Sequence, residues 1–200
     1  PSDYNGLKMR MPGLGGRTIE KLGATPVLLA GSDVLPSLSS GAVDAAEWIC
    51  PAADLGAGLY QAAKYYYGPG WHEPSTLLDL SMDLASWEKL DSATQGLIDD
   101  MTKSFNMTVF SRFQAANGPA LQKLLGEHNV QLKQFPDEVL IALGNAAGEV
   151  VSERGSINSE TKGICNHLLS FRKNIMDWST KGESEFARIR NLSFKYPDSV

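Results

Sequence analysis

Short apolar runs alternate with helical stretches along the first quarter of the chain. Residues 6–12, 25–30 and 42–48 are runs of strand length, with glycine or proline at or next to their ends. Between them, 17–23 and 33–41 have the pattern of short helices that end in glycine, a common residue at the left-handed position after a helix. Strands and helices that alternate at this spacing predict a parallel or mixed sheet flanked by helices.

After residue 50 the pattern becomes mostly helical. A helix is expected at 52–67, before the chain-breaking sequence Gly-Pro-Gly, and a strand is expected at 75–83. From 86 to 111 apolar residues recur on one face of a helix, and a strand at 130–135 interrupts the helical pattern. Proline and aspartate then open a helical region that continues from 137 nearly to 194.

Composition and charge narrow the class of protein. The 200 residues are 42% hydrophobic, which is enough to bury a core, and the net charge is −5. An acidic chain offers no basic surface to nucleic acid, and no apolar run reaches the roughly 20 residues that span a bilayer. Because the sequence starts at Pro1 and shows no leader pattern, we expect that an upstream segment has been removed.

The two cysteines leave two states open. Cys50 and Cys165 form no CxxC pair, so they do not predict a zinc site. They are either two separate buried thiols or, in an exported protein, the two halves of one disulfide.

Arg10 is the first candidate for binding a ligand. It lies near the end of the first predicted strand, and its neighbours Met9 and Met11 are expected to point to the opposite face. Ligands of open α/β sheets bind at the carboxyl ends of strands, and a guanidinium grips a carboxylate through two parallel hydrogen bonds. Arg10 is therefore a candidate for binding an organic acid, with an ordinary surface arginine as the alternative.

Two glutamates form the second candidate. Glu47 and Glu73 each lie close to a tryptophan and a proline, at the two ends of one helix-containing segment. If that segment folds back, the two carboxylates can hold a hard cation such as sodium or calcium, which takes oxygen ligands. The alternative is one capping carboxylate and one surface carboxylate that share no ligand.

His72 beside Glu73 suggests a general base for an enzyme. No nucleophile accompanies this pair in the pattern, and the sequence contains no GxSxG, HExxH or phosphate-binding loop. Catalysis on a small acid therefore stays an alternative to a binding role.

Several motifs together resemble one protein family. Lys8–Arg10, Leu22–Val27 and Gly41–Glu47 match, in order, the patterns K-x-R, L-G-A-x-P-V and G-x-x-D-A-x-E of the DctP-type solute-binding proteins of TRAP transporters. The stretches KYYYGPGWHEP (64–74) and RNLSFKYP (190–197) are similar to the branch that binds 2-oxo and 2-hydroxy monocarboxylates with a metal ion. The resemblance covers nearly the whole chain, as the C-terminal two-thirds of such a protein.

This resemblance implies a fold and a function. The family has an α/β fold of two lobes, the type II periplasmic-binding-protein fold, with the ligand in the cleft between them. The resemblance implies that the protein is the extracytoplasmic, non-catalytic component of a transporter. Such a component captures a small organic acid in the periplasm and delivers it to a TRAP membrane permease. Because family members are longer, we expect most of the N-terminal lobe to be absent from this chain.

The resemblance also implies a layout. Residues 1–47 and 84–200 are expected to form the second α/β lobe, and 48–83 is expected to be a crossover segment that belongs to the first lobe. The strand–helix alternation, which breaks near 48 and resumes near 83, supports this division. Apolar residues at 186–194 predict a homodimer through the C-terminal helices, as in the resembling branch.

Site residues follow from the same resemblance. Arg10 is expected to bind the substrate carboxylate, and Glu47, the Trp48 carbonyl and Glu73 are expected to hold a calcium or sodium ion. Glu47 and the Trp48 indole are also expected to meet the substrate, where the chain crosses between the lobes. Formal charge favours calcium, because two glutamates and an acid outweigh one arginine. Two other functions stay open, an α/β enzyme acting on a small carboxylic acid and an intracellular sensor lobe.

Overall fold

The computed structural model describes residues 1–73, 78–195 and 197. They fall into two compact units, Pro1–Ala147 and Gly148–Val200. Every strand found among these residues lies in the first unit, and the described part of the second is helical apart from its connections and tail. The predicted assignment of 48–83 to a different lobe from 1–47 stays a prediction.

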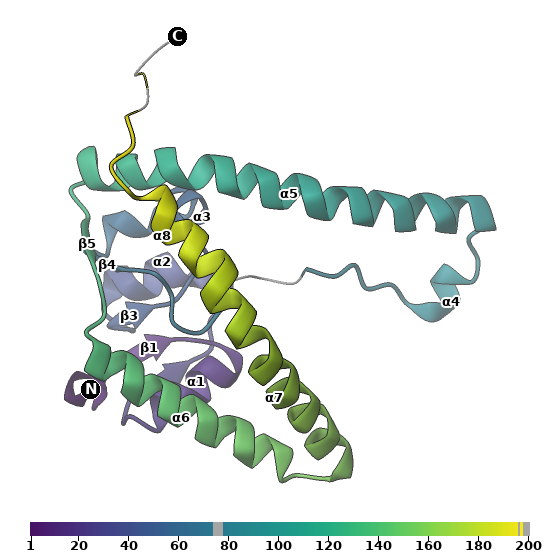
Figure 1. The fold of residues 1–200 in the computed structure, drawn as a ribbon, viewed down its shortest axis with the longest axis horizontal. Coiled ribbons are helices and arrows are strands. Elements are labelled where there is room, and N and C mark those ends of the chain that lie inside the picture. Colours follow the sequence, from purple (N-terminus) through teal and green to yellow (C-terminus); the bar gives the residue numbers. More distant parts are fainter. Residues whose placement is uncertain (74–77, 196, 198–200) are drawn as a thin grey trace. The chain divides into compact units, whose positions relative to one another are not determined.

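A three-stranded parallel sheet organises the start of the first unit (Figure 1). Its strand order is β2 (Thr25–Val27), β1 (Lys8–Arg10), β3 (Ala45–Ala46). The crossovers run through α1 (Gly13–Glu20) and α2 (Gly31–Ser40). The predicted alternation of strands and helices around a parallel sheet is confirmed, and Arg10 lies at the carboxyl end of the central strand.

Two glycines allow the tight connections of this sheet. A Cβ on Gly16 would lie 2.6 Å from the carbonyl oxygen of Met11, so α1 can start this close to the end of β1 only without a side chain there. Gly41 ends α2 with a φ of 74°, in the left-handed region that glycine adopts without strain.

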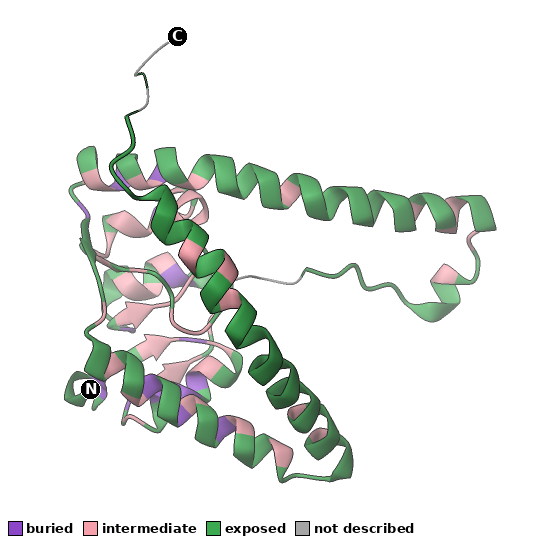
Figure 2. Ribbon diagram, in the orientation of Figure 1, coloured by how far each residue is buried: buried purple, intermediate pink, exposed green. Residues whose placement is uncertain are grey.

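The main hydrophobic core of this unit lies between α1, the end of β1 and the first part of α6 (Asp137–Gly155). Ile19, Val34 and Leu143 are fully buried. Figure 2 shows buried positions along α6 and among the elements around the sheet. Ile19 and Leu143 belong to one cluster, together with Tyr4 and Met11. The helix after residue 136 was predicted, and its apolar face covers the core around α1.

The predicted helix at 52–67 is wrong in its second half. Three short elements replace it: α3 (Pro51–Gly56), η2 (Leu59–Gln61) and β4 (Tyr65–Tyr67). Gly58 has a φ of 71°, which breaks the helical path. The three tyrosines pair in parallel with β5 (Gln131–Lys133), the strand that the sequence did predict. Aromatic side chains favour such a pleated arrangement.

The predicted strand at 75–83 is not found in its described part. Residues 75–77 lie outside the described residues, and 78–83 form no strand. Two helices follow, α4 (Leu84–Trp87) and the long α5 (Ser92–Gly126). Asp91 caps α5 by accepting a hydrogen bond from the backbone of Thr94 at 2.8 Å. Much of α5 is exposed, including its apolar side chains Leu97, Met101, Phe105, Met107, Phe110 and Phe113.

The second unit continues from the end of α6 into α7 (Ser159–Ser179). Asn158 starts α7 with a reciprocal capping box to Thr161, so the predicted helical region is interrupted there. A π-helical turn, Thr180–Ser184, leads into α8 (Glu185–Arg190), which ends before the predicted limit near 194. Among the described residues, no helix has the length and apolarity needed to cross a membrane.

Candidate functional site

Strand pairing brings Arg10 and Glu47 together. The backbone N–H of Glu47 donates to the Arg10 carbonyl at 2.9 Å, which continues the ladder between β1 and β3. The Arg10 guanidinium Nη1 then donates to the Glu47 carboxylate at 2.7 Å and to its backbone carbonyl at 2.8 Å. Each of these two side chains is only 11% exposed. A largely buried ion pair thus lies at the carboxyl end of the central strand, where ligands of α/β sheets bind.

Trp48 covers this ion pair from one side. The Arg10 guanidinium lies over the indole, 5.0 Å from the ring centroid. Gly31, at the start of α2, leaves room for the ring, because a Cβ there would come within 2.6 Å of the indole Cη2. The ring position therefore depends on a residue without a side chain.

His72 and Glu73 come to the same place from the other end of the 48–73 segment. Donor atoms of Glu47, His72 and Glu73 all lie within 4.8 Å of one another. The His72 Nε2 lies 3.7 Å from the Glu47 Oε1. Oxygen ligands of calcium lie at about 2.3–2.6 Å from the ion, so two of them can be up to about 5 Å apart. The spacing of the three side chains therefore fits a shared cation.

Three polar atoms at this site are buried and have no hydrogen-bond partner among the described residues. They are Nε of Arg10 and both ring nitrogens of His72. Buried polar groups are nearly always paired, because leaving one unpaired costs about 1–3 kcal/mol. Unpaired atoms beside two carboxylates fit a site that is completed by a ligand.

Comparison with known proteins assigns the family. A model of the family described as DctP, bacterial extracellular solute-binding protein family 7, matches residues 1–156. The chain belongs to this family. A monocarboxylate 2-oxoacid-binding periplasmic protein of Nostoc sp. is 34% identical over 192 residues, which are 96% of this chain and 52% of that protein.

Solved structures of TRAP solute-binding proteins share the fold. One TRAP periplasmic solute-binding protein, from Pseudoalteromonas atlantica, has bound sodium and pyruvate (TM-score 0.87, 29% identity, 96% of this chain and 57% of that one). Another, from Colwellia psychrerythraea, has bound calcium and pyruvate (TM-score 0.86, 30% identity, 93% of this chain and 57% of that one). A dimer from Bordetella bronchiseptica has calcium and picolinate (TM-score 0.85, 32% identity, 94% of this chain and 56% of that one). This DctP-family chain spans about half the length of the Nostoc protein, its curated relative.

The structure brings the side chains of the predicted site residues near one another, whereas the roles predicted for them, including that of the Trp48 carbonyl, stay predictions. Arg10, Glu47 and Trp48 form one cluster, and Glu73 joins it through Glu47. His72, which sequence reasoning treated only as a general base, belongs to the cluster as well. Its position next to Glu73 was the one available signal, because its burial depends on contacts distant in the sequence.

Asp54 was missed by sequence reasoning, and it fixes the chain just after Trp48. It is buried in α3, where it accepts hydrogen bonds from the Ile49 backbone at 3.2 Å and from the Tyr66 hydroxyl at 2.5 Å. Burial raises the pKa of Asp54 above its ordinary value, although these hydrogen bonds oppose the change. Burial and the bond to Asp54 raise the pKa of Tyr66. The pair ties β4 to the segment that carries Trp48.

Replacing Tyr66 by phenylalanine is expected to lower the free energy of unfolding by about 1–3 kcal/mol, because the buried Asp54 loses a donor. Chemical denaturation of the complete gene product measures the effect. Tyr65→Phe is the matched control, since Tyr65 is exposed on the same strand and should lose almost nothing. Equal losses for the two variants would contradict the role of the pair.

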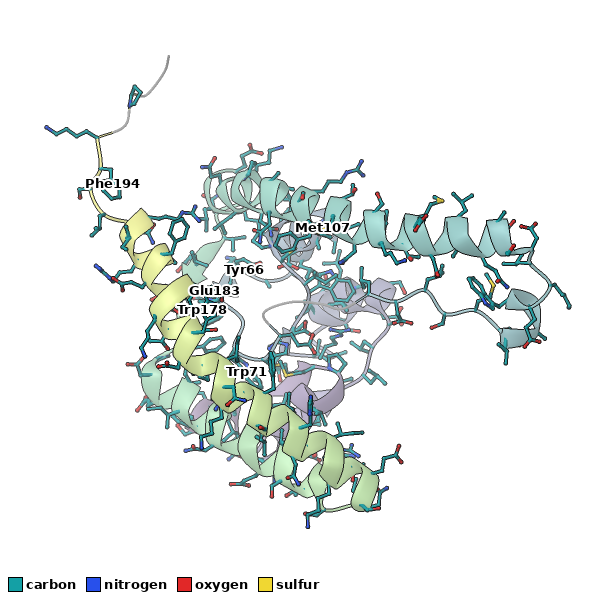
Figure 3. All side chains as sticks on the ribbon, turned by 45° about the vertical axis from the view of Figure 1, so that its right-hand side comes forward. Tyr66, Trp71, Met107, Trp178, Glu183 and Phe194 are labelled. Atoms are coloured by element: carbon teal, nitrogen blue, oxygen red, sulfur yellow. The ribbon has the colours of Figure 1, made fainter. Side chains whose placement is uncertain are left out.

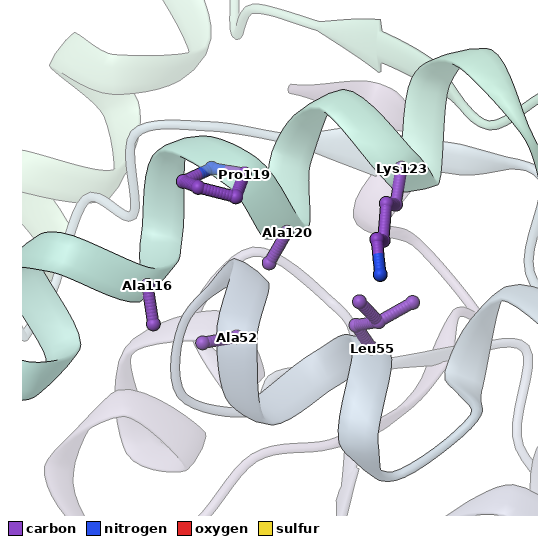
Figure 4. Close-up of a pocket in the computed structure, with 6 residues that line it drawn as sticks. All are labelled: Ala52, Leu55, Ala116, Pro119, Ala120 and Lys123. Atoms are coloured by element: carbon purple, nitrogen blue, oxygen red, sulfur yellow. The ribbon is translucent and has the colours of Figure 1, made fainter.

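A second concave site, between α3 and α5, is a weaker candidate. It is lined by Ala52, Leu55, Ala116, Pro119, Ala120 and Lys123 (Figure 4). Five of these side chains are apolar, and only Lys123 carries a charge. The pocket therefore lacks the converging polar groups that orient a small ligand.

Proposed function

We propose that this chain is the ligand-binding part of an extracytoplasmic solute-binding component of a TRAP transporter. Its ligand would be a small 2-oxo or 2-hydroxy monocarboxylate, captured together with a cation in the periplasm and delivered to the membrane permease. The single observation that carries the proposal is the buried Arg10–Glu47 pair, beside Glu73 and three unpaired polar atoms. Such a cluster suits recognition, and we assign no catalytic role to it.

Arg10 would hold the substrate carboxylate. Its Nη1 is already engaged by Glu47, but its buried Nε has no partner among the described residues and is available as a donor. Charge-assisted hydrogen bonds of this kind are short and strong. The Trp48 indole lies against the guanidinium and would form an apolar wall for the substrate tail.

Glu47, Glu73 and the Trp48 carbonyl would hold the cation, in line with the sodium and calcium of the pyruvate-bound relatives. When bound, the cation offsets the negative charge that two glutamates and a carboxylate bring to one place. The two glutamates, the substrate carboxylate and Arg10 together carry a formal charge of −2. A divalent ion brings this sum to zero, whereas sodium leaves one negative charge. The charge balance thus favours calcium over sodium.

Calorimetry with a panel of ligands tests the proposed function. Pyruvate, lactate and longer 2-oxo monocarboxylates are titrated into the complete gene product, with pyruvamide and an uncharged sugar as controls. We expect the 2-oxo or 2-hydroxy monocarboxylates to bind and the controls, which carry no carboxylate, to fail. Equal binding of pyruvate and pyruvamide would contradict the role of Arg10.

The arrangement of lobes is also part of the proposal. Residues 48–83 would belong to the first lobe, whose remainder corresponds to the half of the curated relative that this chain does not match. Both ends of this segment contribute to the cluster, Trp48 at its start and His72 and Glu73 near its end. A crossover between lobes would place these residues at the cleft.

A homodimer through the C-terminal helices is expected. Exposed apolar side chains recur along the second unit, two of which are labelled in Figure 3. They include Ile164, Leu168, Phe171, Trp178, Phe186, Leu192 and Phe194. Apolar surface of this extent usually marks an interface. Light scattering on the complete gene product should give twice the monomer mass, and Phe186→Glu combined with Leu192→Glu should restore the monomer. A monomer at high concentration would end this prediction.

A further inference from the structure

The contact between Gly31, the first residue of α2, and the Trp48 indole is too close for any side chain at position 31. A Cβ there would lie 2.6 Å from Cη2, 3.3 Å from Cζ2 and 3.6 Å from Cζ3 of the ring. A real Cβ is essentially never found within 3.0 Å of a non-bonded heavy atom. The outer edge of the indole therefore lies directly against the backbone of α2.

Space, and not backbone conformation, explains the glycine at this position. The φ of Gly31 lies outside the positive range, so alanine would fit its backbone. Alanine is also the better helix former, so a glycine here lowers the stability of α2. The three nearest atoms that a Cβ would meet all belong to Trp48. The glycine thus accommodates the ring.

Arg10 constrains the same ring from a second direction. Its guanidinium lies over the indole, 5.0 Å from the ring centroid, and its Nη1 is held by two hydrogen bonds to Glu47, of 2.7 and 2.8 Å. The ring therefore has a backbone at its edge and a fixed guanidinium over its face. A methyl group at position 31 would push the indole away from α2 or turn it to another rotamer.

We propose that Gly31 is a specificity-determining residue, which sets the position of the Trp48 wall and thereby the length of acid tail that the site accepts. The inference rests on the proposed function, because it takes the indole as the wall for the tail. A ring pushed away from α2 enters the space of the tail, and a ring in another rotamer no longer covers it. A longer tail loses more in both cases, whereas the carboxylate is common to all the acids.

Calorimetry on the complete gene product, loaded with calcium, compares a short acid with a longer one. The unaltered protein should bind both pyruvate and 2-oxopentanoate. Gly31→Ala should lower the ratio of 2-oxopentanoate affinity to pyruvate affinity by at least about tenfold, since one methylene in an apolar pocket is worth about 10–200-fold. An unaltered protein that accepts pyruvate alone, or a ratio that Gly31→Ala leaves unchanged, would overturn the inference.

Gly144→Ala is the matched control. Gly144 is an exposed residue of α6, and a Cβ there would meet nothing within 4 Å. The affinity ratio should therefore stay the same in this variant. A fall equal to that of Gly31→Ala would show that the ratio does not report the contact with Trp48, and the inference would be lost.

A second background tests whether the effect passes through the indole. Trp48→Phe keeps an aromatic ring but lacks the outer edge that lies against Gly31. In this background Gly31→Ala should change the affinity ratio by less than about twofold, because the methyl group no longer meets the ring. A change as large as in the unaltered protein would mean that Gly31 acts through the backbone of α2, which contradicts the proposal.

Nuclear magnetic resonance of the ligand-free protein gives a readout that needs no acid. The indole N–H signal of Trp48 is assigned by its loss in Trp48→Phe. Gly31→Ala should shift this signal and leave those of the other three tryptophans in place. A Trp48 signal that does not move would overturn the inference, whatever the acids do.

The inference and the proposed function fail in different ways. If the acids bind and their affinity ratio does not respond to Gly31→Ala, only the specificity role of Gly31 falls. If no acid binds with any cation, the proposed function falls and the specificity role falls with it.

Discussion

Replacing Arg10 by alanine is expected to weaken binding of a 2-oxo acid by at least about tenfold, because one hydrogen bond to a charged group contributes about 1.5–3 kcal/mol. The same change removes the partner of the buried Glu47 carboxylate, so the thermal stability of the ligand-free protein should fall as well. Calorimetry gives the affinity and a melting curve gives the stability. Binding and stability are thus separate readouts of one residue.

Arg10→Lys distinguishes charge from geometry. Lysine keeps the positive charge but cannot present the planar fork that serves Glu47 and the substrate together. We expect Arg10→Lys to recover more of the lost stability than of the lost affinity. Arg17→Ala is the control, since Arg17 is exposed and pairs with the exposed Glu20, so its loss should change neither quantity appreciably. Acid binding that survives Arg10→Ala unchanged would remove Arg10 from the site.

Replacing Glu47 by glutamine is expected to have the largest effect on the cation. The substitution preserves shape but removes the charge that faces Arg10, His72 and Glu73. Breaking a buried ion pair by removing one partner costs about 3–5 kcal/mol, and the cation loses a carboxylate ligand at the same time. Cation affinity should therefore fall by about a hundredfold or more, measured by calorimetry without the acid.

Glu20→Gln is the matched control for this variant. Glu20 is an exposed carboxylate in the same unit, and its loss should leave cation binding unchanged. If Glu47→Gln binds the cation as tightly as the unaltered protein, the glutamate serves only to orient Arg10 and the metal site is elsewhere.

The sequence predicted the parts of this site that depend on local order. The alternation of strands and helices led to the parallel sheet, and the end of a strand is where Arg10 and Glu47 meet. The tryptophan and proline near each of Glu47 and Glu73 suggested a shared cation site as one of two interpretations, and the resemblance to the DctP family favoured it and added the Trp48 carbonyl. The local pattern gave the wrong element where strand partners are far apart in the sequence. It predicted helix for β4, which forms a strand by pairing with Gln131–Lys133.

The positions of Asp54 and His72 could not be predicted from the sequence for the same reason. Asp54 matters through Tyr66, 12 residues away, and His72 through its contact with Glu47. A single carboxylate or imidazole in a sequence gives no sign of its burial, which is set by packing of segments that are far apart. Asp54 lies in a predicted helix and His72 is next to the predicted site residue Glu73. Only the three-dimensional structure shows that they are buried and not ordinary surface residues.

Dependence of acid binding on the cation is the central claim, and one calorimetric comparison tests it most directly. Pyruvate is titrated into the complete gene product in sodium-free buffer, first after treatment with chelator and then after reloading with calcium. We expect chelation to weaken pyruvate binding by about tenfold or more and calcium to restore it, with the acid raising calcium affinity by the same factor. Pyruvate binding that is unchanged by chelation and by Glu73→Ala would contradict a shared site for acid and cation.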